Sequence, residues 1–210
     1  LTVWAVYDTA RRIFDETVAL ASALFLALSF LHVRDSHFGV TDIPMTAMVV
    51  IAVGAIVRWQ KAGGLRLAAI AGLLAGLATS TKYNGLGVAV PFAVAAGARV
   101  FASRGQPRAL AGTLTATAVF ASTLAMALFA TSPYILIDWN RFVRSVSATQ
   151  AMITAGHGMV IGRGWWYYAT VILPAAVGWP IFMAGILGIA GALLTRFRET
   201  AALFAFPIAY

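Results

Sequence analysis

Long apolar runs separated by short polar stretches make up most of this chain. Six of these runs approach the roughly 20 residues that a helix needs to cross the hydrocarbon core of a bilayer. They are Thr17–Val33, Ile43–Trp59, Leu65–Thr81, Asn84–Val100, Ala109–Thr131 and Trp165–Thr195. The pattern therefore predicts an all-α, polytopic transmembrane bundle of about six spanning helices.

The last run is the longest and contains two prolines, Pro174 and Pro180. A proline inside a helix removes a backbone hydrogen bond and bends the helix axis. We expect an interfacial turn near Trp165–Leu173, followed by a spanning helix that bends around Pro180.

Apolar residues also occupy both ends of the sequence, at Leu1–Tyr7 and Ala201–Tyr210. Each stretch is about half as long as a spanning helix or shorter. We expect the sequence to be a fragment that begins and ends within helices. No signal peptide is visible at its start.

The composition agrees with a membrane protein. Only 10% of the 210 residues are charged, whereas a soluble domain has roughly 25%, and the mean hydropathy is +0.86. The net charge of +8 comes from basic residues dispersed between apolar runs, which argues against a nucleic-acid-binding patch. Cysteine is absent, so disulfides and thiolate metal sites are excluded.

The basic residues indicate how the helices are oriented. If every run crosses the membrane, one face carries ten Lys and Arg residues and the other carries five. The positive-inside rule then places the first face in the cytoplasm. The ten are Arg11, Arg12, Arg58, Lys61, Arg66, Arg99, Arg104, Arg108, Arg196 and Arg198, and the five are Arg34, Lys82, Arg141, Arg144 and Arg163.

The extracytoplasmic face receives nearly all of the unusual polar residues, and Arg34–Asp42 is the densest group. A charged side chain at the bilayer centre costs roughly 2.5–3.5 kcal/mol even on the mildest scale, so this group must lie at a membrane edge or in a wet cavity. We interpret it as a functional site in which Arg34 holds the carboxylate of Asp42 at a helix start. The alternative is that Asp42 only caps the helix that continues through Pro44.

A second polar group, Lys82-Tyr83-Asn84, joins two apolar runs without a long loop. An ammonium group is a compact counter-charge for a phosphate, so Lys82 and Tyr83 are candidates for binding the phosphate of a lipid-linked substrate. The alternative is that Lys82 only extends toward the outer headgroups. In the run before Lys82, Gly72 and Gly76 have the spacing typical of close helix packing.

The one long connection, residues 132–164, is extracytoplasmic on this topology. It opens with Ser132-Pro133-Tyr134, which ends the preceding helix, and continues to Asp138. From Trp139 to Met152, apolar residues alternate with basic ones, which predicts a helix lying on the outer membrane surface.

The end of this connection holds His157 between two glycines, and then Arg163. Glycine neighbours would let His157 approach a ligand closely, although an ordinary surface loop has the same pattern. The aromatic row Trp165–Tyr168 is typical of the belt at a membrane interface.

These motifs, in this order, resemble those of the bacterial branch of the protein O-mannosyltransferase and aminoarabinose transferase superfamily, which are membrane glycosyltransferases of the GT-C fold. The residues that carry the resemblance are Arg34-x-Ser36-His37-Phe38-x-x-Thr41-Asp42-x-Pro44, Gly72-x-x-x-Gly76-Leu77-Ala78 leading to Thr81-Lys82-Tyr83, and Ser132-Pro133-Tyr134 with Asp138.

The resemblance implies transfer of a hexose or pentose from a polyprenyl-phosphate donor to a protein, lipid or glycan acceptor. The reaction would take place on the extracytoplasmic side of a bacterial inner membrane. In such enzymes the main catalytic carboxylate lies in the first external loop, which would precede Leu1. No cofactor is expected, a divalent metal is left open, and no metal ligand is assigned.

The predicted site follows from these matches. Asp42 and Arg34 match the second external motif, a supporting part of the catalytic site, to which we add His37. Lys82 matches the lysine at the helix break and, with Tyr83, would bind the donor phosphate. The remaining predicted substrate-binding residues are Tyr134, Asp138, His157 and Arg163, of which the last two are assigned by position only.

Two other classes of protein fit the apolar pattern. In a transporter or channel, Asp42, Lys82 and His157 would line a path for protons or solute. The ionisable residues gather at one face rather than near the middle of the membrane, which favours the transferase. In a scaffold subunit, the outer polar cluster would be an interaction surface.

Overall fold

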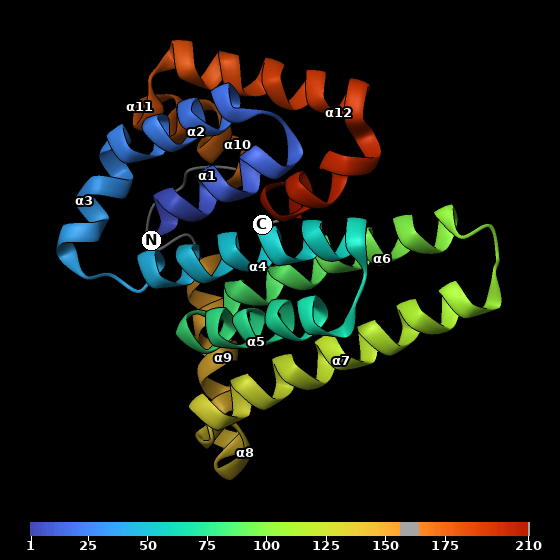
Figure 1. Cartoon of the computed structure of the whole chain (residues 1–210). Helices are drawn as coiled ribbons and strands as arrows, with labels where there is room; N and C mark the ends of the chain where they lie inside the picture. Colours follow the sequence, from blue (N-terminus) through green and yellow to red (C-terminus); the bar gives the residue numbers. More distant parts are fainter. Residues whose placement is uncertain (156–163, 210) are drawn as a thin grey trace.

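The computed structural model describes residues 1–155 and 164–209, and every regular element in this part of the chain is a helix (Figure 1). In chain order these are α1 (Thr2–Ile13), α2 (Glu16–Leu28), α3 (Phe30–Phe38), α4 (Asp42–Ala62), α5 (Leu65–Thr81), η1 (Tyr83–Val88), α6 (Ala89–Ala102), α7 (Pro107–Thr131), α8 (Tyr134–Ile137), α9 (Trp139–Thr154), α10 (Gly164–Tyr167), the π-helical turn η3 (Tyr168–Ile172), α11 (Leu173–Val177) and α12 (Trp179–Ala209).

Four of these elements are long and apolar enough to cross a membrane: α4, η1 with α6, α7, and α12. A fifth is formed if α2 and α3 are taken as one span with a bend of 55° between them. The apolar run Leu65–Thr81 forms α5, which has 17 residues and is shorter than the others. The predicted all-α transmembrane architecture is confirmed. The described residues hold four to five candidate spans, where the sequence predicted about six, because Leu65–Thr81 is short for a span and the run Thr17–Val33 is broken between α2 and α3.

The last apolar run differs from its prediction in two places. Residues from Gly164 onward form α10, the π-helical turn and α11, so the expected interfacial turn is helical. The chain bends at Gly178, whose φ is +83°, and α12 begins at Trp179. Pro180 thus lies in the first turn of α12, where proline needs no amide partner. The predicted bend around Pro180 is wrong because glycine makes the bend before it.

A second break lies within the range of α12. Arg196 has non-helical backbone angles, with φ of −135° and ψ of 38°. After this residue the chain turns back toward α4 and α6, as the red end of the ribbon shows (Figure 1). The ring of Phe206 lies so close to Gly87 that an added Cβ there would be 3.1 Å from it. Residues 197–209 therefore run back along the bundle.

The core of the bundle lies where α4, α5, α6 and α7 meet. Trp59 of α4 stacks on Phe92 of α6 with 4.6 Å between ring centroids, and Phe92 stacks on Phe120 of α7 at 4.0 Å. Trp59 and Phe92 are buried almost completely. One column of aromatic rings thus holds α4, α6 and α7 together.

The glycines of α5 let α7 approach its backbone. A Cβ placed at Gly72 would be 2.3 Å from the carbonyl oxygen of Phe120, and one at Gly76 would be 2.3 Å from that of Leu124. No real Cβ reaches such distances, so only glycine permits this crossing. The predicted role of these two glycines in helix packing is confirmed.

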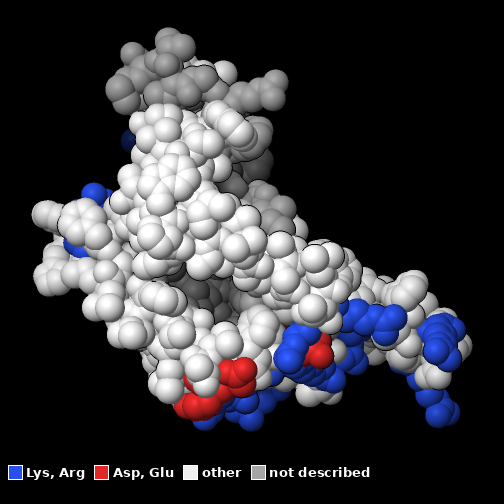
Figure 2. All heavy atoms as spheres, turned by 90° about the horizontal axis from the view of Figure 1, so that it is seen from above, with Lys and Arg blue, Asp and Glu red and all other residues white. Residues whose placement is uncertain are grey.

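The bundle has two chemically different ends. At one end, which we call the basic end, the turns at residues 63–64 and 103–106 lie near the break at Arg196. Lys61 donates to the carbonyl oxygen of Arg12 at 3.1 Å and lies 3.3 Å from a carboxylate oxygen of Glu199. Figure 2 shows Lys and Arg side chains gathered along one edge of the molecule. The opposite end, which we call the Asp42 end, holds the start of α4 and the connections of residues 81–83 and 132–139.

Candidate site at the Asp42 end of the bundle

An ion pair joins the starts of two helical elements at the Asp42 end. The ammonium nitrogen Nζ of Lys82 lies 2.7 Å from the carboxylate oxygen Oδ1 of Asp42. These residues are 40 positions apart in the sequence. Their side chains are 41% and 44% exposed, so the pair is open to a ligand from outside the bundle.

The sequence around Asp42 explains its position. The chain leaves α3 through Gly39, whose φ is +63°, and α4 begins at Asp42. Thr41 is the N-cap and makes no side-chain capping bond, so Asp42 is the first residue of the helix rather than its cap. A carboxylate there is stabilised by the helix dipole, and its side chain points to Lys82.

The sequence around Lys82 forms a tight connection. Lys82 is extended, with φ of −156° and ψ of 130°, between the end of α5 and the start of η1. Gly85 then folds back onto α5, and an added Cβ there would be 2.4 Å from the carbonyl carbon of Ala78. Because this approach requires glycine, Gly85 lets η1 pack against the end of α5 directly after Lys82.

Arg34 has a different partner from the one that the sequence suggested. Its Nε donates to Oδ1 of Asp35 at 2.8 Å, and its guanidinium lies 5.8 Å from the ring centroid of Phe30. The expectation that Arg34 holds Asp42 is therefore wrong, and Lys82 is the cation beside that carboxylate. Arg34 and Asp35 are consecutive residues of α3, so their pairing does not depend on how α3 packs against α4.

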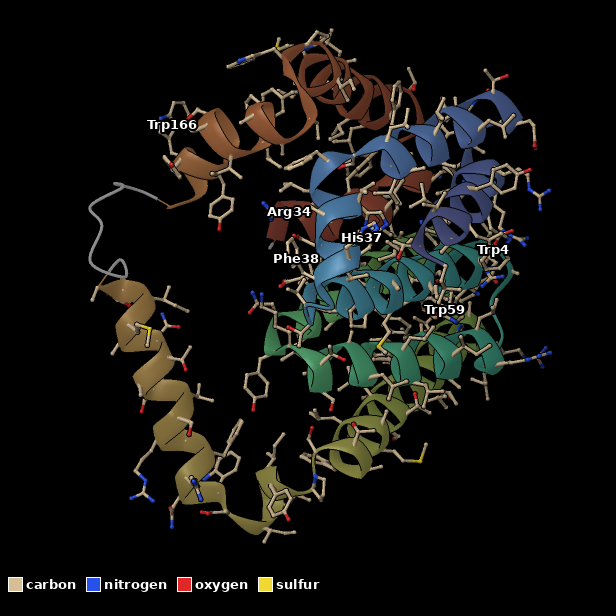
Figure 3. All side chains as sticks on the ribbon, turned by 90° about the vertical axis from the view of Figure 1, so that its left-hand side faces the viewer. Trp4, Arg34, His37, Phe38, Trp59 and Trp166 are labelled. Atoms are coloured by element: carbon tan, nitrogen blue, oxygen red, sulfur yellow. The ribbon has the colours of Figure 1, made fainter. Side chains whose placement is uncertain are left out.

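His37 lies on the same helix as Arg34. Its ring nitrogen Nδ1 is 2.8 Å from the carbonyl oxygen of Val33, one turn earlier. Figure 3 shows Arg34, His37 and Phe38 projecting from α3 near the start of α4. The structure thus places these residues on the helix that leads into the site, and the catalytic role of His37 stays a prediction.

The outer connection contributes through aromatic contacts. Tyr83 meets Phe142 of α9 edge to face, with 5.6 Å between the ring centroids. This contact holds α9 beside Lys82. The helix predicted from Trp139 to Met152 is present as α9, and its place on the membrane surface stays a prediction.

For Tyr134 and Asp138, the contacts in the structure support a role in substrate binding less directly. Tyr134 is 75% exposed at the start of α8. Asp138 is the N-cap of α9 and accepts a hydrogen bond from the backbone amide of Arg141 at 3.1 Å. The capping bond already accounts for the placement of Asp138, and substrate binding by either residue stays a prediction. The two further candidates, His157 and Arg163, lie outside the described residues.

Sequence reasoning missed a polar contact next to the pair. The hydroxyl oxygens of Ser80 and Ser132 are 2.6 Å apart, which ties the end of α5 to the end of α7. Ser132 belongs to a motif that the sequence did single out, and Ser80 stands two residues before Lys82. Their contact could not be predicted because it depends on how α5 and α7 cross.

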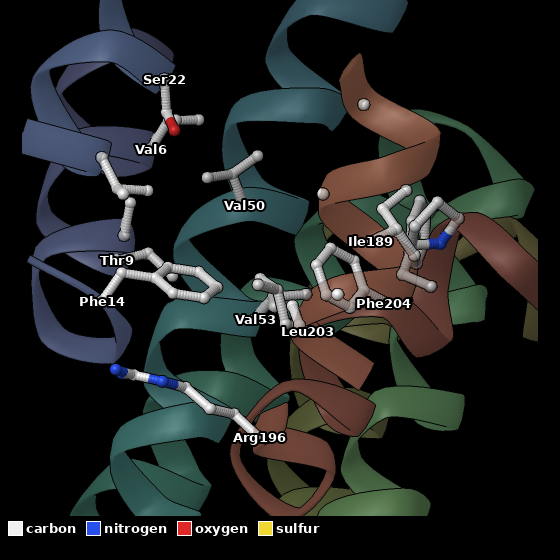
Figure 4. Close-up of a pocket in the computed structure, with 18 of the residues that line it drawn as sticks. Val6, Thr9, Phe14, Ser22, Val50, Val53, Ile189, Arg196, Leu203 and Phe204 are labelled. Atoms are coloured by element: carbon white, nitrogen blue, oxygen red, sulfur yellow. The ribbon is translucent and has the colours of Figure 1, made fainter. Parts of the chain in front are cut away.

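A large apolar cavity lies between α1, α2, α4 and α12 (Figure 4). Its volume is about 800 Å³, within the range of about 300–1,000 Å³ that is usual for small-molecule sites. Its lining includes Phe14, Val53 and Ile189, with Arg196 toward the basic end. It extends along α4 to Thr46, one turn after Asp42. The cavity thus runs along α4 from the turn after Asp42 toward the basic end, and neither Asp42 nor Lys82 is among its lining residues.

Among residues 1–155 and 164–209, no group of three or more His, Asp or Glu side chains lies close enough to hold a metal ion. Within the described residues, the ion pairs in this region are that of Lys82 with Asp42 and that of Arg34 with Asp35 on α3.

Comparison with protein families identifies the chain. The model of the dolichyl-phosphate-mannose-protein mannosyltransferase family matches residues 1–137. The chain belongs to this family. Comparison with curated proteins and with solved structures finds no match.

Membership in the mannosyltransferase family implies a membrane glycosyltransferase that moves a lipid-linked sugar to an acceptor. The matched region contains both members of the ion pair, the helix that carries Arg34 and His37, and Tyr134. Asp138, His157 and Arg163 follow it. The predicted family and the predicted class of enzyme are thus confirmed at this level.

Proposed function

We propose that the protein transfers a sugar from a polyprenyl-phosphate donor to an acceptor on the extracytoplasmic side of the membrane, and that Lys82 binds the donor phosphate. The observation that supports this proposal most is the ion pair of Lys82 and Asp42. The positive-inside rule assigns the basic end of the bundle to the cytoplasm, and the ion pair lies at the opposite end.

The energetics of the pair favour a functional role over a structural one. Both partners are more than a third exposed, and exposed ion pairs stabilise a fold by only about 0–1 kcal/mol. Stabilisation of the fold therefore explains little of why two charges lie at a membrane edge. Asp42 orients the ammonium group of Lys82, and this group stays exposed enough to contact a phosphate.

In the reaction that we propose, an oxygen of the acceptor attacks the anomeric carbon of the sugar. The bond between this carbon and the phosphate oxygen breaks, and the phosphate leaves with the electron pair. The proton of the acceptor hydroxyl passes to a carboxylate base. Lys82 stabilises the negative charge that develops on the leaving phosphate, while Asp42 orients the ammonium group.

The apolar cavity supports a lipid donor. A polyprenyl chain must stay in an apolar environment while its phosphate reaches the polar boundary. The cavity extends to Thr46, which lies one turn from Asp42, and its walls are mostly aliphatic, aromatic or glycine residues. An isoprenoid tail in this space would bring its phosphate toward Lys82.

The test measures transfer of radiolabelled sugar from polyprenyl-phosphate donors in membranes that contain the full-length parent protein. We expect Asp42→Asn and Lys82→Ala each to lower donor-dependent labelling by more than tenfold, because loss of one donor to a developing oxyanion costs about 10²–10³ in rate. Lys82→Arg, which keeps the charge, should retain more activity than Lys82→Ala.

Lys61→Ala is the matched control, since it removes a lysine from another exposed ion pair at the opposite end of α4. Its activity should stay within about twofold of the wild type. Equal losses in Lys61→Ala and Lys82→Ala, at equal protein level, would remove Lys82 from the site. Absence of transfer from every polyprenyl-phosphate donor in the wild type would contradict the proposed donor.

A further inference from the structure

A polar cavity lies at the basic end, away from the Asp42 end. Its volume is about 620 Å³, and it is lined by Val100, Phe101, Ala102, Arg104, Gly105 and Arg198. The first five belong to the end of α6 and the turn toward α7, and the last belongs to the returning part of α12. Two arginines that are distant in sequence thus line one space.

The surrounding backbone holds both arginines in place. Arg104 has a left-handed backbone with φ of +48° in the turn after α6. The guanidinium of Arg198 lies over the ring of Phe101, with 5.9 Å between Cζ and the ring centroid. The side chain of Gln60 donates a hydrogen bond to the carbonyl oxygen of Arg198. The position of Arg198 is therefore defined by contacts with α4 and α6.

The positive charge of this cavity is not neutralised within the described part of the chain. The carboxylates at the basic end have other partners: Asp8 pairs with Arg12 and Glu199 with Lys61. Asp15 accepts a hydrogen bond from the amide of Val18, and Glu16 accepts one from the hydroxyl of Tyr7. No carboxylate among residues 1–155 and 164–209 lies within 4.0 Å of a guanidinium nitrogen of Arg104 or Arg198. Two cationic groups that line one cavity without a carboxylate partner favour an anionic ligand.

The apolar rim of the cavity indicates which anion fits. Phe101 is 76% exposed, and Val100 beside it is also exposed. A soluble anion would leave these side chains in contact with water, whereas a lipid would cover them with its acyl chains. The site lies where a spanning element, η1 with α6, ends, which is the level of the headgroups.

We propose that this cavity binds the headgroup of an anionic phospholipid such as phosphatidylglycerol, with its phosphodiester between Arg104 and Arg198. The basic end is the face that the charge distribution assigns to the cytoplasm, and anionic lipid headgroups bind basic pockets between helices on that side. The η1 and α6 elements separate this cavity from Lys82 by about 30 Å. The site is therefore distinct from the one that we propose for the donor.

The experiment uses the purified full-length protein, stripped of lipid in a neutral detergent. Binding of dioleoylphosphatidylglycerol and of dioleoylphosphatidylcholine is measured by native mass spectrometry. We expect the wild type to bind phosphatidylglycerol at least tenfold more tightly than phosphatidylcholine. The double variant Arg104→Gln/Arg198→Gln should bind phosphatidylglycerol about thirtyfold more weakly than the wild type, which corresponds to about 1 kcal/mol for each arginine.

Arg66→Gln is the matched control, because Arg66 is an exposed arginine at the same end but outside the cavity. It should change the affinity by less than threefold. Equal affinity for the two lipids, or an equal loss in Arg66→Gln, would overturn the proposal. Competition by inorganic phosphate at the same concentration as the lipid would also overturn it, because the site would then bind a free anion.

Thermal unfolding of the lipid-free variants shows whether the fold is intact. If Arg198→Gln disturbs the returning part of α12, the affinity of the single variant Arg104→Gln for phosphatidylglycerol is used to test the proposal. The side chain of Arg104 makes no hydrogen bond to the described residues, so its loss should leave the fold unchanged. Unchanged affinity in an intact Arg104→Gln variant would contradict the proposal.

Discussion

Replacing Gly76 by alanine tests whether the crossing of α5 and α7 depends on glycine. An added Cβ at Gly76 would be 2.3 Å from the carbonyl oxygen of Leu124 and 2.7 Å from the Cβ of Ala127. Ordinary contact begins at 3.4 Å, so the two helices must part by about 1 Å. Because the nearest atom belongs to the backbone, no rotamer change relieves the clash.

The magnitude combines two opposing effects. Overpacking of this kind destabilises by about 1–3 kcal/mol, and we expect the upper part of this range. Alanine in a helix interior gains up to about 1 kcal/mol over glycine. The net destabilisation of Gly76→Ala should therefore be about 1–2 kcal/mol.

Gly97→Ala is the matched control. Gly97 lies within α6, faces the outside of the bundle and has no heavy atom within 4 Å of an added Cβ. The helix-propensity gain is then unopposed, and Gly97→Ala should be slightly more stable than the wild type. The free energy of unfolding of both variants is measured by titration of the full-length protein with sodium dodecyl sulfate in mixed micelles.

The two variants should therefore change stability in opposite directions. If Gly76→Ala were as stable as Gly97→Ala, the close approach of α5 and α7 would be refuted. The substitution should also affect activity, because α5 ends at Thr81, directly before Lys82. Transfer by Gly76→Ala should fall at a temperature where the protein stays folded, while Gly97→Ala keeps wild-type transfer.

Three further substitutions probe other contacts. Phe92→Ala removes the middle ring of the aromatic column and should lower the free energy of unfolding by about 3–5 kcal/mol, whereas Phe25→Ala, at an exposed position, should lower it far less. Arg99→Gln removes two hydrogen bonds to carbonyls at the end of α4 and a contact with the Trp59 ring, so the same titration should show a loss of about 1–3 kcal/mol, and no loss would contradict the contacts. Asp138→Ala removes the cap of α9 and should destabilise this helix by about 0.5–2 kcal/mol, seen as faster amide exchange at its start and not in α7.

The sequence alone determined that the apolar runs form helices and where several of these helices end. Apolar runs with the length of a bilayer must form helices, because lipid offers no partner for backbone amides. The runs Ile43–Trp59 and Ala109–Thr131 became α4 and α7 with their ends shifted by a few residues. The polar groups at Asp42 and Lys82 also had to lie at helix ends, because charges are costly within lipid.

Local rules were less reliable where two of them competed. Pro180 was expected to bend a helix, but Gly178 breaks the chain two residues earlier and leaves the proline in a first turn. Arg34 was expected to pair with Asp42, but its neighbour Asp35 is closer along the same helix. In the first case a nearby glycine makes the bend, and in the second a neighbouring carboxylate pairs with the arginine.

Only the tertiary structure decided which helix ends meet. The pairing of Asp42 with Lys82 depends on how α4 packs against α5, and the apolar cavity depends on the return of the chain after Arg196. Helix crossings are set by the shapes of whole side-chain surfaces, which no single run of residues contains. The sequence therefore determined which groups stand at the edge of the membrane, and the packing of the helices determined which of them form a site.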